Sequence, residues 1–193
     1  ASALAEAEVE YEDKQSHALD VAFAVKDLAD FAQRAGLATV PKAVDFVIWT
    51  TTPWTLPANQ AVSLHPELVY VVVQADIAGQ TRILVLAQAL YEATLVRYQA
   101  ENIQVLAEVV GQAFEHVALQ HPFYERVVPV IVGEHVTADA GTGAVHTAPG
   151  HGQDDFIIGK KYDLLVDNPV DNNGVFLSNT PLFAGMHVNK ANE

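Results

Sequence analysis

The sequence predicts a mainly β fold, a closed or nearly closed β-barrel with flanking α-helices. Three observations support this prediction. Many short segments are rich in Val and Ile, these segments are bounded by Gly, Pro, Asp or Asn, and few stretches have a helical pattern. The chain has 193 residues, of which 50% are hydrophobic, so it can bury a core, and we expect a single domain over residues 1–193.

The expected elements follow in chain order. Ala18–Gly36 is expected to form a helix ending at Gly36, although the alternation at its start is equally typical of a strand. Ile77–Gln80, which contains Gly79, predicts a tight hairpin, and Asp171–Gly174 predicts a turn because Asn-Gly readily adopts positive φ. The expected strands are Val44–Thr50, Val69–Gln74, Arg82–Ala87, Ile103–Val110, Val127–Val132 and Gly143–Thr147. The further expected helices are Gln88–Gln99 and a short one from about Gly152 to Tyr162.

The charge balance argues against a domain that holds nucleic acid by itself. The net charge is −14, and Lys160-Lys161 is the only adjacent basic pair. The absence of Cys excludes disulfides, thiolate zinc sites and a cysteine nucleophile. No apolar run approaches the ~18 residues of a membrane helix, so we expect no membrane association and a cytoplasmic location. Because the chain starts at Ala1 and ends at Glu193, we expect it to be excised from a longer protein.

The first unusual stretch is Trp49–Asn59, with the sequence WTTTPWTLPAN. Thr50, Thr51 and Thr52 end a strand, and Pro53 suits the first position of a helical turn, which makes Thr52 a natural N-cap. Clustered hydroxyls and free backbone N–H groups at such a junction can hold a carbonyl or a developing oxyanion. The alternative is that the threonines are simply good strand formers and Thr52 merely caps.

The second unusual stretch is Gly141–Asp155, with the sequence GTGAVHTAPGHGQDD. Its small residues let the backbone approach a ligand closely, and a strand presents His146. A Pro-Gly turn then leads into a helix whose first turn contains Asp154 and Asp155. Stabilisation by the helix dipole is enough by itself to account for both acids, which is the alternative to a role in a site. Adjacent helix residues point about 100° apart, so only one of the two is expected to face a pocket, and the spacing does not decide which.

Other kinds of site have weaker support. His146, His151 and Asp155 are a conceivable metal site, but their spacing does not match the His-Glu-x-x-His helix pattern, and we expect no metal. The sequence contains neither the Gly-x-Ser-x-Gly elbow of serine hydrolases nor a phosphate-binding Gly-x-x-x-x-Gly-Lys-Ser/Thr loop.

Trp49–Asn59 and Gly141–Asp155 resemble the signature peptides of the isoleucyl-tRNA synthetase editing domain, a large insertion in the class I catalytic fold. The resemblance continues through Ala5–Tyr11 and Asn168–Val170. The related valyl and leucyl editing domains typically have Arg after the first two threonines. Here Thr52 occupies that place, which favours the isoleucyl type.

The resemblance implies a β-barrel of the Val/Ile/Leu-tRNA synthetase editing-domain type that hydrolyses tRNA(Ile) wrongly charged with valine. Asp155 would hold the α-ammonium group, and His146 would lie against the amino-acid side chain and exclude isoleucine. No cofactor is implied, and the implied partners are the valine-charged tRNA(Ile) acceptor end and the rest of a parent synthetase. The parent's ATP-site signatures are absent, so no ligase site is expected. The implied catalytic positions are Thr50, Thr51, Thr52 and Asp155, and the implied substrate-binding positions are His146, Asn59, Asp155, Trp49 and Gly150.

Three alternatives stay open: a valyl or leucyl editing domain, a non-catalytic module that binds the acceptor end, and a metal-dependent hydrolase. No general base is identified. Lys160-Lys161 is a candidate contact with the acceptor end, or else an ordinary solvated helix end.

Overall fold

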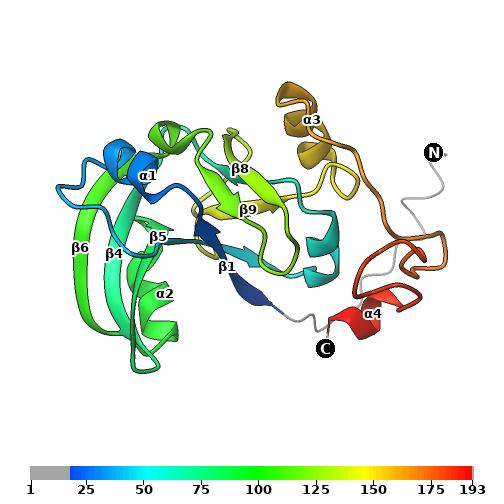
Figure 1. The fold of residues 1–193 in the computed structure, drawn as a ribbon, viewed down its shortest axis with the longest axis horizontal. Coiled ribbons are helices and arrows are strands. Elements are labelled where there is room, and N and C mark those ends of the chain that lie inside the picture. Colours follow the sequence, from blue (N-terminus) through cyan, green and yellow to red (C-terminus); the bar gives the residue numbers. More distant parts are fainter. Residues whose placement is uncertain (1–17, 193) are drawn as a thin grey trace, which may run out of the picture.

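The computed structural model describes residues 18–192, and the stretch Ala5–Tyr11 lies outside them. Within these residues, nine strands form one sheet in the order β6-β4-β5-β2-β1-β7-β8-β3-β9. Figure 1 shows α1 near the end of the molecule formed by β4 and β6, and α3 at the opposite end. The predicted mainly β fold with flanking helices is confirmed. The elements are β1 (Leu19–Val25), α1 (Leu28–Arg34), β2 (Asp45–Thr50), η1 (Pro53–Ala58), β3 (Ala61–Leu64), β4 (Val69–Ile77), β5 (Gln80–Ala87), α2 (Tyr91–Arg97), β6 (Glu101–Val110), η2 (Gly111–Phe114), β7 (Ala118–Gln120), β8 (Val127–Val132), β9 (Ala144–Thr147), α3 (Gln153–Lys161) and α4 (Val188–Ala191).

The sheet is not a closed barrel, so of the two predicted forms, closed or nearly closed, the closed one does not apply. Its outer strands, β6 and β9, do not pair with each other. Instead β9 packs beside β2, which pairs with β1 along its whole length and with β5 at Asp45 and Phe46. The packing of β9 beside β2 adds no hydrogen-bonded ladder, so the sheet stays open.

The start of the Ala18–Gly36 stretch is a strand, which is the alternative that its alternating pattern left open, and the helix occupies only the second half. Leu19–Val25 forms strand β1, because its alternating side chains pair with β2 on one side and, at its end, with β7 on the other. The helix starts only after Asp27, whose Oδ1 accepts hydrogen bonds from the N–H groups of Ala29 (3.1 Å) and Asp30 (2.9 Å). Gly36 follows the helix with φ +65°, as a C-terminal glycine should.

The other predicted strands, the helices over Gln88–Gln99 and Gly152–Tyr162, and both turns are confirmed, with shifted ends in most cases. Ala78 and Gly79 both have positive φ in the two-residue hairpin between β4 and β5. In the second turn the Gly174 N–H donates to the Asp171 carbonyl over 3.1 Å. Strands β3 and β7 and helix α4 were not predicted.

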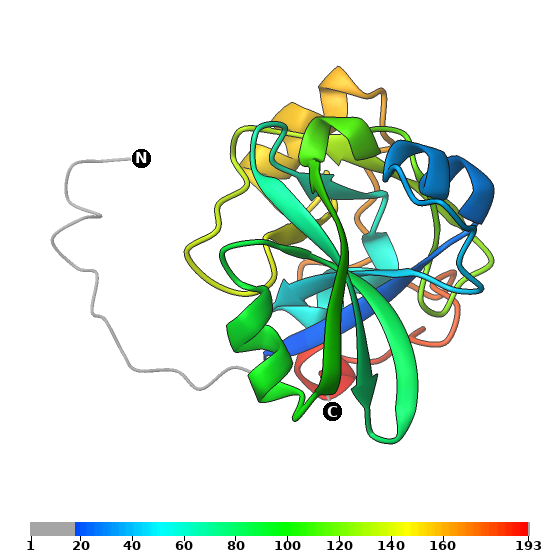
Figure 2. The same ribbon diagram turned by 90° about the vertical axis from the view of Figure 1, so that its left-hand side faces the viewer.

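The core lies on both sides of β4 and β5. Along β4 the buried side chains alternate, with Val72 in the cluster that contains Phe31 of α1 and Val73 in the cluster that contains Leu95 of α2. The helices α1 and α2 therefore cover opposite faces, as the view from this end shows (Figure 2). At the other end Ile158 anchors α3 in a small cluster with β3 and β8. No helix in the described part of the chain is long and apolar enough to cross a membrane.

Candidate functional site

The structure brings the two unusual stretches together. The first continues from β2 through η1 to Asn59, and the following strand, β3, pairs antiparallel with β9 so that Val62 lies opposite His146. Across this pair the hydroxyls of Ser63 and Thr147 are hydrogen-bonded at 2.6 Å. The ring of Trp54 in η1 contacts the ring of His151 edge-on, with centroids 5.3 Å apart.

A continuous hydrogen-bond chain holds the His146 ring. The Asn59 side-chain nitrogen Nδ2, which can only donate, bonds the Ala61 carbonyl at 2.9 Å and lies 3.2 Å from His146 Nδ1. His146 Nδ1 is therefore the acceptor, and the proton sits on Nε2, which lies 2.7 Å from Thr55 Oγ1. The Thr55 hydroxyl donates onward to the Thr52 carbonyl at 2.9 Å. This network selects one tautomer and one ring orientation.

His146 is also held uncharged. His146 is 8% exposed. This burial lowers the pKa of His146 to about 4, and the nearby His151 and His121 lower it further in the same direction. Asn59 is fully buried, and its Oδ1 has no hydrogen-bond partner among the described residues. At neutral pH this corner therefore presents a neutral, fixed imidazole with a rigid amide behind it.

The burial of neutral His146 predicts that stability falls in acid. The folded pKa is about 4 and the ordinary value is 6.5, so the unfolded chain binds the extra proton first. The contribution of His146 is complete above about pH 6.5 and is lost as the pH falls to about 4, where the loss approaches about 3 kcal/mol. This loss of stability is measured by urea unfolding of the wild type and of His146→Gln at pH 7 and at pH 4.5. The variant should lose less stability between these pH values, and an identical pH dependence would contradict the prediction.

The three threonines differ in exposure and in contacts. Thr50 is buried, and its Oγ1 accepts a hydrogen bond from the Thr52 N–H at 3.1 Å and lies 3.5 Å from the Thr52 hydroxyl. Thr51 and Thr52 are exposed. Thr52 does occupy the N-cap position of η1, but its side chain caps nothing, so the expected side-chain cap is wrong. Its hydroxyl lies beside that of Thr50 instead.

The structure separates the two adjacent aspartates that spacing alone could not. Asp155 is half-buried, and its Oδ2 accepts a hydrogen bond from the Ala148 N–H at 2.9 Å, one residue after the end of β9. Burial raises the pKa of Asp155, although this hydrogen bond and the neighbouring His135 and His151 oppose the rise. Asp154 is exposed and lines a cavity on another side of α3. Asp155 is thus the one built into the β9–α3 connection.

Two other predicted positions have clear packing roles. A Cβ at Gly150 would lie 2.2 Å from the Asp167 carbonyl oxygen, so only glycine allows this close approach. Trp49 is half-buried against Gly141, where a Cβ would come within 2.8 Å of the Trp49 Cβ. Gly150 and Trp49 thus shape the backbone around the site.

Two residues that support η1, Thr55 and His121, were not among the predicted site residues. Thr55 links His146 to Thr52, and its i+3 spacing from Thr52 is the signal that was available. His121 is 1% exposed, and its Nε2 lies 3.0 Å from the Leu56 carbonyl. Nothing in the sequence near His121 indicates this long-range contact.

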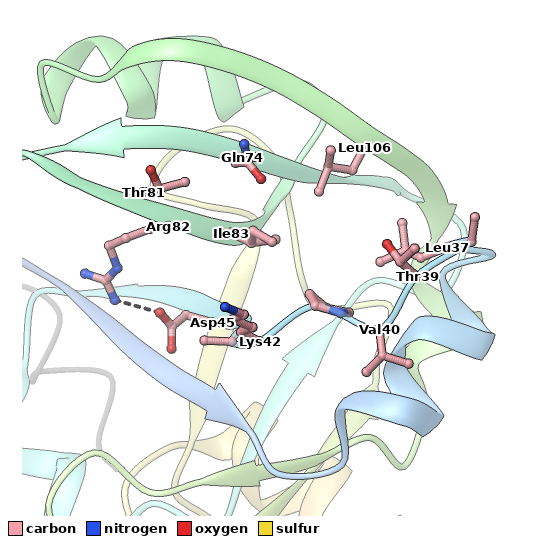
Figure 3. A pocket seen from close by; sticks show the side chains of 13 residues that line it. Leu37, Thr39, Val40, Lys42, Asp45, Gln74, Thr81, Arg82, Ile83 and Leu106 are labelled. Carbon is pink, nitrogen blue, oxygen red and sulfur yellow. Dashed lines mark hydrogen bonds and ion pairs between the residues drawn. The ribbon is translucent and has the colours of Figure 1, made fainter.

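In the part of the chain that the structure describes, neither a metal site nor the cavity beside β5 brings the predicted site residues together. Over residues 18–192 no group of three or more His, Asp or Glu residues is arranged to hold a metal ion, so the metal interpretation finds no support in the geometry. A cavity of about 590 Å³ lies between the segment before β2 and strand β5 (Figure 3). It contains an ion pair between Arg82 and Asp45 at 2.6 Å, and none of the predicted site residues line it.

Known proteins resemble this chain in sequence and in fold. A family model described as the leucyl-tRNA synthetase editing domain matches residues 37–189. The isoleucine–tRNA ligases of Alkalilimnicola ehrlichii and Thiobacillus denitrificans are each 59% identical to it, over 99% of the chain and 20% of the relative. The chain thus spans about a fifth of the length of these relatives, and they agree with the isoleucyl resemblance.

Solved structures share the fold at low sequence identity. GlLeuRS-CP1 aligns with a TM-score of 0.69 at 14% identity, covering 91% of this chain and 92% of that one. The P. knowlesi cytosolic leucyl-tRNA synthetase editing domain aligns with a TM-score of 0.70 at 10% identity, covering 95% of this chain and 94% of that one. Because the family model covers residues 37–189, well over half of the chain, this chain belongs to the leucyl-tRNA synthetase editing-domain family.

Proposed function

We propose that this chain hydrolyses the ester of valine-charged tRNA(Ile) as the editing part of an isoleucine–tRNA ligase. The observation that supports this proposal most is the series of hydrogen bonds that links Asn59, His146, Thr55 and Thr52. This series holds the neutral imidazole of His146 in one orientation. Such a ring suits a steric wall that admits valine and excludes isoleucine. The two amino acids differ by one methylene, worth about 10–200-fold in an apolar pocket, and isoleucyl-tRNA synthetase is itself the standard example of this limit.

Asp155 supplies the charge that recognises the amino acid. Its half-buried carboxylate, oriented by the Ala148 N–H, matches the α-ammonium group of an aminoacyl ester. Recognition then requires Asp155 to be ionised and the amine to be free and protonated. An acylated amine would lack the positive charge and should be rejected.

His146 does not act as the general base. Its Nδ1 already accepts from Asn59, and its Nε2 proton is donated to Thr55, so neither nitrogen can take a proton from water without breaking the network. The ester is already activated, so placing a water and stabilising the oxyanion can suffice. The hydroxyls of Thr50 and Thr52 and the backbone around them supply the polar groups for this task.

The acidic composition predicts that the chain by itself binds tRNA weakly. It has only 10 Lys and Arg residues, and Arg34, Arg82 and Arg97 are each paired with a carboxylate. We expect a Kd of about 10 μM or weaker. The slope of the logarithm of the binding constant against the logarithm of the salt concentration is about −0.7 to −0.9 per phosphate contact, and since we expect few such contacts, the slope should be shallow. Titration of tRNA(Ile) at several salt concentrations measures both. Sub-micromolar binding with a steep slope would show that the rest of a parent synthetase is not needed for affinity.

Deacylation assays test the proposed function directly. The chain should hydrolyse Val-tRNA(Ile) and leave Ile-tRNA(Ile) intact when the two are incubated side by side. Hydrolysis of neither, with measurable binding of the tRNA, would indicate a non-catalytic module for the acceptor end. Loss of hydrolysis on treatment with a chelator, restored by added metal, would favour a metal-dependent hydrolase.

A further inference from the structure

A second cavity lies on the side of α3 that carries Asp154. It has a volume of about 470 Å³ and is formed by α3, the turn after β8 and the region around Gln112. Asp154, Ile157 and Lys161 line it from α3, at spacings of three and four residues that place them on one side of the helix. Asp155 is adjacent to Asp154 but points about 100° away, toward Ala148.

The chemistry of this cavity does not suit a phosphate. Its charged lining residues are the carboxylates of Asp154 and Glu134 and the ammonium of Lys161, so negative charge is in excess. Ile157 offers an apolar surface that is 59% exposed. His135 also lines the cavity, and its buried Nε2 has no hydrogen-bond partner among the described residues. A group that donates hydrogen bonds to a carboxylate and packs against an apolar side chain fits this lining.

We propose that the cavity receives the cytosine that precedes the terminal adenosine of the tRNA acceptor end, with its 4-amino group donating to the Asp154 carboxylate. Carboxylates are the side chains that accept from the cytosine amino group. This inference rests on the proposed function, which places the esterified terminal adenosine beside Asp155. A helix is only about 10–12 Å across with its side chains, so the preceding nucleotide can reach the side of α3 that carries Asp154.

The proposal also explains how a chain of net charge −14 contacts an RNA end. All three nucleotides of a CCA end carry an exocyclic amino group, which is a donor. A carboxylate-lined cavity reads such a base without needing a basic surface. Binding by base contacts is compatible with the shallow salt dependence expected above.

Short RNAs test the cavity without any hydrolysis. The chain is titrated with uncharged oligonucleotides that end in CCA or in CUA, in which uracil replaces the amino donor by a carbonyl acceptor. The methyl NMR signal of Ile157 reports occupancy. We expect the CCA oligonucleotide to shift this signal and to bind about 5–100-fold more tightly than the CUA oligonucleotide, the range for one well-placed base contact.

Asp154→Asn should bring this ratio close to one, because the carboxamide can donate to the uracil carbonyl. Asp163→Asn is the matched control. It removes the same charge from an exposed position outside the cavity, and its φ of +53° is one that Asn tolerates. The control should keep the full preference for CCA.

Equal binding of the two oligonucleotides, no shift at millimolar RNA, or equal loss of preference in both variants would overturn the proposal. A shift of Ile157 caused by a basic peptide but not by the CCA oligonucleotide would do the same and indicate a protein partner. These outcomes are separate from failure of the proposed function. That failure appears as intact Val-tRNA(Ile) with wild-type chain, whether or not the CCA preference exists.

Discussion

Asp155→Asn is expected to lower kcat/KM for deacylation of Val-tRNA(Ile) by a factor of about 30 to several thousand. This corresponds to about 2–5 kcal/mol, the usual cost of removing one partner of a desolvated charge pair. Asparagine keeps an oxygen that can accept the Ala148 N–H bond of 2.9 Å, so the β9–α3 connection should stay folded. The loss should therefore report the missing charge opposite the α-ammonium group. Deacylation kinetics, with thermal unfolding of the same preparation, measure both quantities.

Two other acids, Asp154 and Asp163, serve as comparisons for Asp155. Asp163→Asn removes an exposed carboxylate away from the site and should leave deacylation unchanged. Asp154→Asn should keep kcat, with an effect confined to KM, because Asp154 is exposed on another side of α3. If Asp154→Asn lowered kcat as much as Asp155→Asn, the assignment of the ammonium partner to Asp155 would be wrong.

The sequence predicted correctly those elements whose conformation depends on a few consecutive residues, such as tight turns. The hairpin at Ala78 and Gly79 and the turn at Asp171 need particular backbone conformations, and their residues allow them. The choice between helix and strand for β1 stayed open because it depends on pairing with β2 and β7, which no local pattern contains. Strand β3 was missed because its four residues are all buried and do not alternate.

The same distinction applies to the site. The sequence indicated the two stretches, since glycine, proline and threonine clusters are unusual in ordinary scaffold, and the structure brings the two into contact. The sequence could not indicate that Asn59 and Thr55 meet His146 from 87 and 91 residues away, because that contact depends on the pairing of β3 with β9. Nor could it decide between a closed and a nearly closed barrel, because pairing between the outer strands β6 and β9 is a long-range feature.

His146→Ala is expected to make Ile-tRNA(Ile) a substrate. The wild-type ring is buried, neutral and held at both nitrogens, so it acts through its volume and not through charge. Removing it opens space for at least one methylene, and hydrolysis of the isoleucyl ester should rise about 10–200-fold. Val-tRNA(Ile) should still be hydrolysed, because Asp155 and the threonine turn remain. Deacylation of the two charged tRNAs, measured in parallel, gives the ratio.

The loss of the ring also leaves Thr55 and Asn59 without their shared partner, which should cost about 1–3 kcal/mol of stability. Thermal unfolding of His146→Ala is therefore needed beside the kinetics. His146→Gln is the matched comparison, since it keeps a polar side chain of intermediate size near Thr55 and should open the pocket less. A selective gain for isoleucine that is larger in the alanine variant supports the steric wall. Parallel loss of both substrates in a folded variant would instead assign His146 to the chemical step.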